Sequence, residues 1–333
     1  MEFICKLNQL KILELELSDI GNEQLIQISQ SMKQLTKLSV GFNDIGGEGL
    51  KLIKELSNSL TILNIEHNQI GNEGLELLSG LTRLDSLDIS TNKIDKFNSI
   101  CNLNQLTILN VSNNIVGNEG VKFISKLKHL TELVMQSCNV KEEGMKSICE
   151  LKNLTNFNIS NNFIRNEGMI LICNSFPLLK CLRASSNKIS NEGVQDITKL
   201  ERLTDLNICR NEISNNGMKS ISGLKKLTCL DVSGNNISDE GATSISQLSQ
   251  LSSLYINDNQ IGDEGMESIS EMNNLSKLWI NDNQIGNIGA KAISVNMHQL
   301  TFLFIANNRI GEEGIKLLEN MKLTYLETFD KLY

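Results

Sequence analysis

Leucine and isoleucine recur along the chain in one arrangement, L-x-x-L-x-L-x-x-N-x-I, which returns every 22 to 25 residues. The L-x-L part alternates with period two, as a β-strand with one buried face does. The segment after the final isoleucine reads G-N-E-G and then I-S-x-L, which predicts a short helix. The units begin at Leu10, Leu35, Leu60, Leu84, Leu106, Leu130, Leu154, Leu179, Leu203, Leu227, Leu251, Leu275 and Leu300, and a partial unit begins at Leu323.

An asparagine follows the strand in nearly every unit. Its amide can both donate to and accept from backbone groups of neighbouring turns, which burial would otherwise leave without partners. The two glycines of G-N-E-G allow a tight turn and a close approach of coils, and the asparagine between them is expected to cap the helix. Ser18 and Cys138 replace the strand-end asparagine in two units, and it stands at Asn43, Asn68, Asn92, Asn114, Asn162, Asn187, Asn211, Asn235, Asn259, Asn283 and Asn308.

These residues resemble the leucine-rich repeat family, and the 24-residue period with I-G-N-E-G is similar to its ribonuclease-inhibitor-like, GALA-type subclass. The resemblance covers the chain from about Leu7 to Phe329. It implies an α/β solenoid, a curved horseshoe with a parallel β-sheet on the concave face and short helices on the convex face. Because repeats of this kind gain stability by stacking, we expect one domain over residues 1–333, with about 13 repeats and partial terminal units.

Some segments depart from the pattern. The fourth unit reads NKIDKFNSICNLNQ, lacks G-N-E-G, and predicts a 3₁₀ or irregular convex segment with a change of curvature. Pro177 stands between a predicted helix and a predicted strand. Cys5, Cys101, Cys149 and Cys173 occupy the serine place of I-S-x-L and are expected to be small buried fillers. Neither end carries the polar cap that solenoids usually have.

Aromatic residues are only 4% of the chain, so a cluster of them is informative. The solvent-facing place between the second and third leucines is almost wholly polar for ten units, and then it becomes Tyr255, Trp279 and Phe304. The neighbouring column adds Phe302 and Tyr325. We expect these five side chains to form one patch, which would be a partner-binding site rimmed by Asp258 and Asp282. The alternatives are that the rings shield the uncapped C-terminal end, or are simply β-favourable.

The net charge of −8 and the absence of a basic run disfavour nucleic acid and anionic membranes as partners. No stretch approaches 18 consecutive apolar residues, and the N-terminus does not resemble a signal peptide. We therefore expect no membrane partner and a cytoplasmic location, which is compatible with an effector delivered into a host cell. We also expect a monomer unless the uncapped ends associate. The three histidines lie in different units, and no phosphate-binding or metal-binding motif occurs, so we predict no enzyme activity, no cofactor and no metal.

The leading functional prediction is a non-enzymatic scaffold that binds a protein or peptide on its concave sheet. A second, acidic feature at Glu14, Glu16 and Glu66 could steer a basic segment. The resemblance to GALA-type proteins, in which an F-box precedes the repeats, implies an alternative role as the substrate-recognition subunit of an F-box ubiquitin ligase that lacks its F-box here. A third alternative is a GTPase-activating protein of the Ran-activator type, with Arg183, Arg210 or Arg309 as the arginine.

Overall fold

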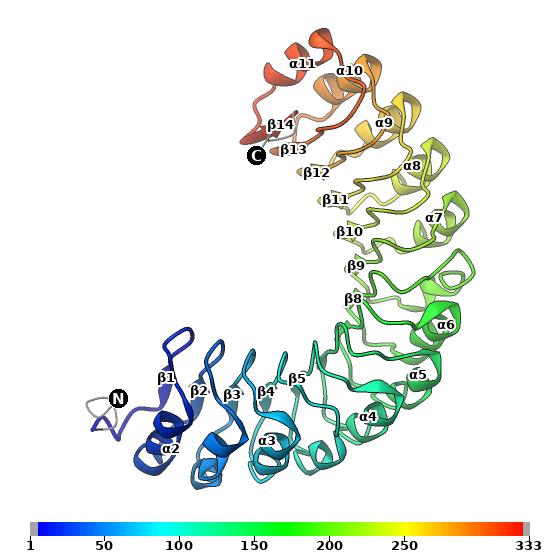
Figure 1. Cartoon of the computed structure of the whole chain (residues 1–333). Coiled ribbons are helices and arrows are strands. Elements are labelled where there is room, and N and C mark those ends of the chain that lie inside the picture. The colour runs from blue at the N-terminus through cyan, green and yellow to red at the C-terminus, as the bar shows by residue number, and fades with distance from the viewer. Residues whose placement is uncertain (1–5, 329–333) are drawn as a thin grey trace. The chain divides into compact units, whose positions relative to one another are not determined.

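The computed structural model describes residues 6–328, and the chain divides into two compact units, Met1–Phe163 and Ile164–Tyr333. In each unit the repeats place three-residue strands on one side and helical segments on the other (Figure 1). All strands within a unit are parallel and pair with the strand of the next repeat. The predicted α/β solenoid is therefore confirmed in both units, and its continuity as a single domain over residues 1–333 stays a prediction.

The first unit contains seven described strands. These are β1 (Ile12–Glu14), β2 (Lys37–Ser39), β3 (Ile62–Asn64), β4 (Ser86–Asp88), β5 (Ile108–Asn110), β6 (Glu132–Val134) and β7 (Asn156–Asn158). The opposite side carries α2 (Asn22–Ser31), η1 (Gly47–Leu50), η2 (Ile53–Leu56), α3 (Gly71–Leu78), η3 (Asn98–Asn102), α4 (Gly117–Ile124) and α5 (Glu142–Ile148), where η marks a 3₁₀ helix. The 3₁₀ segment predicted for the irregular fourth unit is thus confirmed as η3, whereas η1 and η2 were not predicted.

The second unit also contains seven described strands. These are β8 (Cys181–Arg183), β9 (Asp205–Asn207), β10 (Cys229–Asp231), β11 (Ser253–Tyr255), β12 (Lys277–Trp279), β13 (Phe302–Phe304) and β14 (Tyr325–Glu327). The opposite side carries α6 (Arg165–Ser175), η4 (Ile197–Lys199), α7 (Asn215–Ile221), α8 (Asp239–Ile245), α9 (Asp263–Ser270), α10 (Asn287–Asn296) and α11 (Glu312–Glu319). Pro177 lies between α6 and β8, as the sequence predicts.

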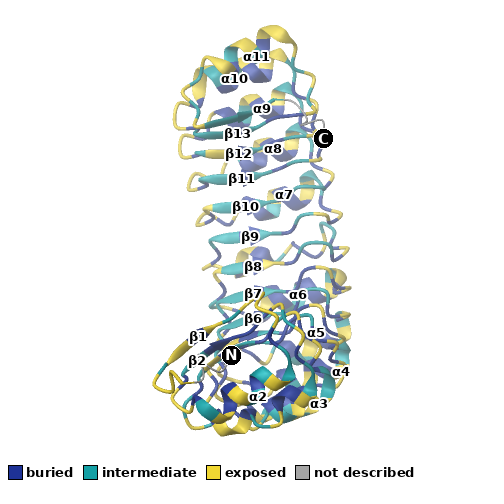
Figure 2. Ribbon diagram, turned by 60° about the vertical axis from the view of Figure 1, so that its left-hand side comes forward, coloured by how far each residue is buried: buried dark blue, intermediate teal, exposed yellow. Residues whose placement is uncertain are grey.

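The core of each unit lies between its strands and its helices, and Figure 2 shows the exposed residues on the outer helix faces and in the loops. The repeat that contains β9 shows how the strand residues divide between core and solvent. Leu203, Leu206, Ile208 and Ile213 are buried, while the strand residues on either side of Leu206 stay half-buried on the solvent side of the sheet. Burying apolar side chains on one face of every strand is the main stabilising contribution of the stack.

The strand-end asparagines form the predicted ladder of hydrogen bonds between repeats. Asn162 is buried, and its side-chain oxygen accepts from the N–H groups of Cys138 and Val140 at 3.1 and 2.9 Å. Its amide nitrogen donates to three carbonyl oxygens at 2.9 to 3.0 Å, one in the preceding repeat and two in its own. One side chain therefore satisfies five backbone groups that water cannot reach.

The cysteines fill two kinds of position. Cys138 takes the ladder place, where its thiol donates to the carbonyl oxygen of Val111 and burial raises its pKa to about 12. Cys173 is buried as predicted, but the same prediction is wrong for Cys101 and Cys149, which are half-buried. All three follow a buried isoleucine, but Cys173 lies within α6, which continues to Ser175, whereas α5 ends at Ile148, directly before Cys149. Cys5 lies outside the described residues.

The asparagine of G-N-E-G does not cap its own helix, so that prediction is wrong. Asn118, in α4, accepts a hydrogen bond from the N–H of Lys141, the residue directly before α5 in the next repeat, at 2.9 Å. Asp263, in α9, likewise accepts from the N–H groups of Gly286 and Gly289 at the start of α10, at 2.7 and 2.8 Å. The side chain already lies inside its own helix, and it reaches the exposed N–H groups of the neighbouring helix instead. The helices are thus linked by a second ladder.

The two glycines of the motif have different roles. Gly71 and Gly117 adopt the left-handed conformation, with φ of 61° and 58°, which turns the chain into α3 and α4. The last glycine provides close packing, as at Gly265, where a Cβ atom would lie 2.5 Å from Asp239 Oδ1 and 2.9 Å from Asp239 Cα. Adjacent helical segments can approach this closely only without a side chain there.

Candidate functional site

The predicted aromatic residues come together on the sheet of the second unit. Backbone pairing places Tyr255 opposite Trp279 and Trp279 opposite Phe304. The strand leucines between these positions and the next alternate residues are fully buried, so the aromatic side chains extend from the solvent face of β11, β12 and β13. The repeat pattern requires no particular residue at these positions.

The rings stack on one another in a continuous line. The centroids of Tyr255 and Trp279 are 4.1 Å apart with the planes 13° from parallel, and those of Trp279 and Phe304 are 5.1 Å apart at 10°. Tyr325 continues the line against Phe304, with 4.8 Å between centroids and a tilt of 30°. We call Tyr255, Trp279, Phe304 and Tyr325 the aromatic row.

The stacking direction determines which parts of the rings in the aromatic row are exposed to solvent. Its spacings match the distance of about 4.8 Å between neighbouring strands, so the line runs across the strands and parallel to the sheet. The ring faces therefore cover one another, and the ring edges point outward. All four side chains are half-buried in consequence. An apolar group laid across these edges would lose water from several rings at once.

Phe302 lies beside the aromatic row and not within it. It pairs with Lys277 on one side and Tyr325 on the other. The ammonium nitrogen of Lys277 stands 5.6 Å from the centroid of the Phe302 ring, within the range of a cation–π contact. The five predicted side chains are thus neighbours, with four in ring contact and the fifth covered by a cation.

The predicted rim lies in the turns that follow β11 and β12. Asp258 and Asp282 are exposed and adopt left-handed backbone conformations, with φ of 53° and 56°. Asp282 Oδ1 accepts a hydrogen bond from the side-chain amide of Asn307 at 2.9 Å. Both carboxylates lie at the edge of the sheet, three residues beyond Tyr255 and Trp279.

A pair of carboxylates next to the aromatic row was not predicted. Asp231 lies opposite Tyr255 in the pairing of β10 with β11, and Asp205 lies opposite Cys229 in the pairing of β9 with β10. Burial, followed by the negative charge of nearby groups that include both carboxylates, raises the pKa of Tyr255. Reading the neighbouring strand column for charged residues as well as for aromatic residues would have identified Asp205.

Cys181, Cys209 and Cys229, in the second unit, are half-buried free thiols. Cys181 and Cys229 pair with Asp205 from opposite sides, so they stand two strands apart. Burial and then the charge of Asp205 raise the pKa of Cys181 to about 11. These cysteines are therefore neutral thiols at neutral pH, and reactive thiolate chemistry is not favoured here.

The acidic residues predicted as a second feature, Glu14, Glu16 and Glu66, lie on the first unit, and each of them has a polar partner. Glu14 Oε1 lies 2.6 Å from Lys37 Nζ in an exposed ion pair that raises the lysine pKa. Glu16 accepts a hydrogen bond from the hydroxyl of Ser39, and Glu66 accepts one from the side chain of Asn64. The charge available for steering a basic segment is therefore partly neutralised.

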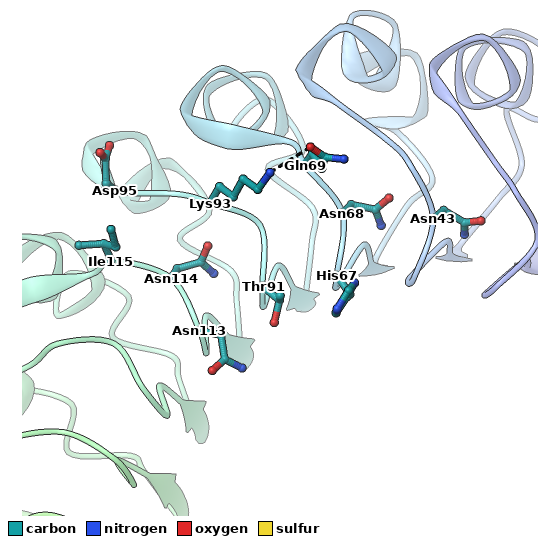
Figure 3. Close-up of a pocket in the computed structure, with 10 residues that line it drawn as sticks. All are labelled: Asn43, His67, Asn68, Gln69, Thr91, Lys93, Asp95, Asn113, Asn114 and Ile115. Carbon is teal, nitrogen blue, oxygen red and sulfur yellow. Dashed lines mark hydrogen bonds between the residues drawn. The ribbon is translucent and has the colours of Figure 1, made fainter.

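The first unit also carries a depression of about 570 Å³ along the loops after β2 to β5, which was not predicted (Figure 3). The ladder residues Asn68 and Asn114 lie along it, and Lys93 donates to Gln69 across it at 3.0 Å. Ile115 is exposed at its end. Because the ladder amides already serve backbone groups, the depression presents few unused polar atoms, and we assign it no function.

Within residues 6–328, no group of three or more His, Cys, Asp or Glu side chains is placed to hold a metal ion. No helix in that range combines the length and apolar character needed to cross a bilayer.

The same repeats are found by comparison with known proteins. One leucine-rich repeat family model matches residues 201–261, and another matches residues 32–54, 56–79, 102–125, 126–149 and 271–294, so that together they cover more than half of the chain. A search of curated protein sequences finds no match.

Solved structures share the fold. An internalin, InlF, from Listeria monocytogenes is 25% identical with a TM-score of 0.67, and the match covers 93% of this chain and 89% of that one. A leucine-rich repeat protein of Leptospira interrogans is 22% identical with a TM-score of 0.60, over 99% and 93% of the two chains. The plant peptide hormone receptor RGFR1, solved in complex with RGF2, is 18% identical with a TM-score of 0.50, over 99% and 64%. The chain therefore belongs to the leucine-rich repeat family.

Proposed function

We propose that the chain is a non-enzymatic interaction scaffold that binds a protein or a peptide on the sheet of its second unit, centred on the aromatic row. The single observation that carries the proposal is the continuous stack of Tyr255, Trp279, Phe304 and Tyr325 on the solvent face. Large aromatic side chains bordered by polar groups are the composition of protein-binding hot spots.

A role in shielding the C-terminal end is a weaker explanation. A terminal cap has to cover the apolar core beyond the last strand, between the sheet and the helices. The aromatic row stands on the opposite, solvent-facing side of the sheet, and it extends back from β14 to β11. Rings in that place cover one another and do not cover the end of the core.

The more specific roles remain additional proposals. The 24-residue period points to the ribonuclease-inhibitor-like, GALA-type subclass. As the substrate-recognition subunit of an F-box ubiquitin ligase, the chain would use the aromatic row to select its substrate. Ran-type GTPase activation would instead require an arginine that reaches a nucleotide. Arg183 is exposed on β8, and loss of any GTPase acceleration in an Arg183→Ala variant would be its signature.

The experiment that tests the proposal compares three immobilised proteins. These are the wild-type chain, a Tyr255→Ala, Trp279→Ala double variant, and an Asn110→Ala, Val134→Ala control that changes the same strand column in the first unit. We expect the wild type and the control to capture a common protein from cytosol, and the aromatic variant to lose it. Direct binding of that purified protein to the wild type completes the test.

Identical captures by all three proteins would contradict the proposal. Circular dichroism checks that each variant keeps the fold, which is expected because the changed side chains lie on the solvent face.

A further inference from the structure

The aromatic row has one open end. Trp279 covers one face of the Tyr255 ring, and the other face is turned toward β10, where Asp231 occupies the paired position instead of another ring. The face of an aromatic ring carries partial negative charge and attracts cations. The end of the row therefore combines a ring face with a neighbouring carboxylate.

The carboxylate of Asp231 is held in place beside this face but is not paired with a cation. Asp231 Oδ2 accepts a hydrogen bond from the side-chain amide of Asn207 at 2.8 Å, and Asp231 Oδ1 accepts one from the N–H of Ser233 at 3.0 Å. Neither Asp231 nor Asp205 forms an ion pair with any residue in the described part of the chain. By contrast, Glu14 on the first sheet is paired with Lys37. Asp231 is thus held in a fixed orientation, and neither carboxylate forms an ion pair within the described residues.

The ring edges favour a different group. Because the faces of Trp279 and Phe304 are used in stacking, a sugar or a base cannot lie flat on them, whereas an aliphatic or aromatic side chain can cover their edges. The net charge of −8 also disfavours a polyanionic ligand. A peptide that carries both a basic and an apolar side chain matches both halves of the surface.

We propose that the ligand of this surface is an extended peptide segment of a partner protein, with an arginine or lysine four positions from an apolar anchor. This inference rests on the function proposed above. The cation lies over the carboxylates of Asp231 and Asp205, beside the open face of Tyr255, and the anchor covers the outward edge of Phe304.

The spacing follows from the strand geometry. Asp231 and Phe304 are three strands apart, or roughly 14 Å at about 4.8 Å per strand. An extended chain advances about 3.3 Å per residue, so roughly four residues span this distance. Side chains of an extended chain alternate between its two faces, and a separation of four returns the second side chain to the face of the first.

The test selects ligands without assuming a sequence. A display library of random nine-residue peptides is selected against the full chain, and in parallel against the Tyr255→Ala, Trp279→Ala variant and an Asp205→Asn, Asp231→Asn variant. An Asp85→Asn, Asp88→Asn variant of the first unit is the matched control. We expect the wild type and the control to enrich a basic residue four positions from an apolar one.

Affinities of the best peptide then separate the two halves of the surface. We expect the Asp205→Asn, Asp231→Asn variant to bind it at least 10-fold more weakly, and the same peptide with arginine replaced by glutamine to bind wild type and variant equally. Enrichment that depends on the aromatic row but carries no basic preference would overturn this inference and leave the proposed function intact. Enrichment that ignores the row, or no enrichment at all, would overturn both.

Discussion

The Trp279→Ala variant is expected to bind the partner about 30- to 1,000-fold more weakly than the wild-type chain. Trp279 lies in the middle of the aromatic row, stacked on Tyr255 at 4.1 Å and on Phe304 at 5.1 Å. Its removal leaves those two rings about 10 Å apart, because they stand two strands from one another. Central aromatic residues of an interface contribute about 2 to 4 kcal/mol, which corresponds to this loss of affinity.

A graded series makes the measurement specific. Trp279→Phe keeps a ring between its neighbours, so we expect it to lose less than about 10-fold in affinity. Thermal unfolding of each variant separates a loss of binding from a loss of fold. Equal affinities for Trp279→Ala and the wild type, measured by calorimetry with the purified partner, would show that the aromatic row lies outside the interface.

The Asn162→Ala variant is expected to lose about 3 to 5 kcal/mol of the free energy of unfolding. The substitution removes five hydrogen bonds and leaves the N–H groups of Cys138 and Val140 buried without their acceptor. Each buried polar group left unsatisfied costs about 1 to 3 kcal/mol, and the cavity adds to this cost.

Chemical denaturation of the whole chain measures this change, with Asn104→Ala as its control. Asn104 is exposed in a turn of the same unit, and we expect its replacement to alter the free energy of unfolding by less than about 0.5 kcal/mol. If Asn162→Ala were as stable as Asn104→Ala, the hydrogen-bond ladder would not be what holds adjacent repeats together.

Much of the fold was predictable because each letter of the repeat has a separate physical requirement. The alternation of Leu206 and Ile208 with polar residues specifies a strand with one buried face, and the constant period fixes the pairing of neighbouring strands. The two hydrogen-bond ladders, at the strand ends and between the helices, differ in how far the sequence predicts them. Asn162 has one set of partners within reach, whereas Asn118 could have bonded either to its own helix or to the next one. The distance between adjacent repeats determines which partner Asn118 bonds to, and this distance cannot be read from the sequence.

The candidate site was predictable in position but not in detail. The register that brings Tyr255, Trp279 and Phe304 together follows from the period alone. The stacking of their rings and the diagonal contact to Tyr325 depend on side-chain torsion angles, which the repeat leaves unspecified. The 3₁₀ segments η1, η2 and η4 replace helices in units that retain most of the motif, and nothing in their sequences explains this.

The fluorescence of Trp279 tests the central claim most directly, because the chain contains only this one tryptophan. Its emission therefore reports on the proposed binding surface and on no other part of the protein. Titration with a purified partner or a selected peptide that lacks tryptophan is predicted to shift the emission to shorter wavelength and to protect it from acrylamide quenching. Saturable binding that leaves both the emission and the quenching of Trp279 unchanged would contradict the account.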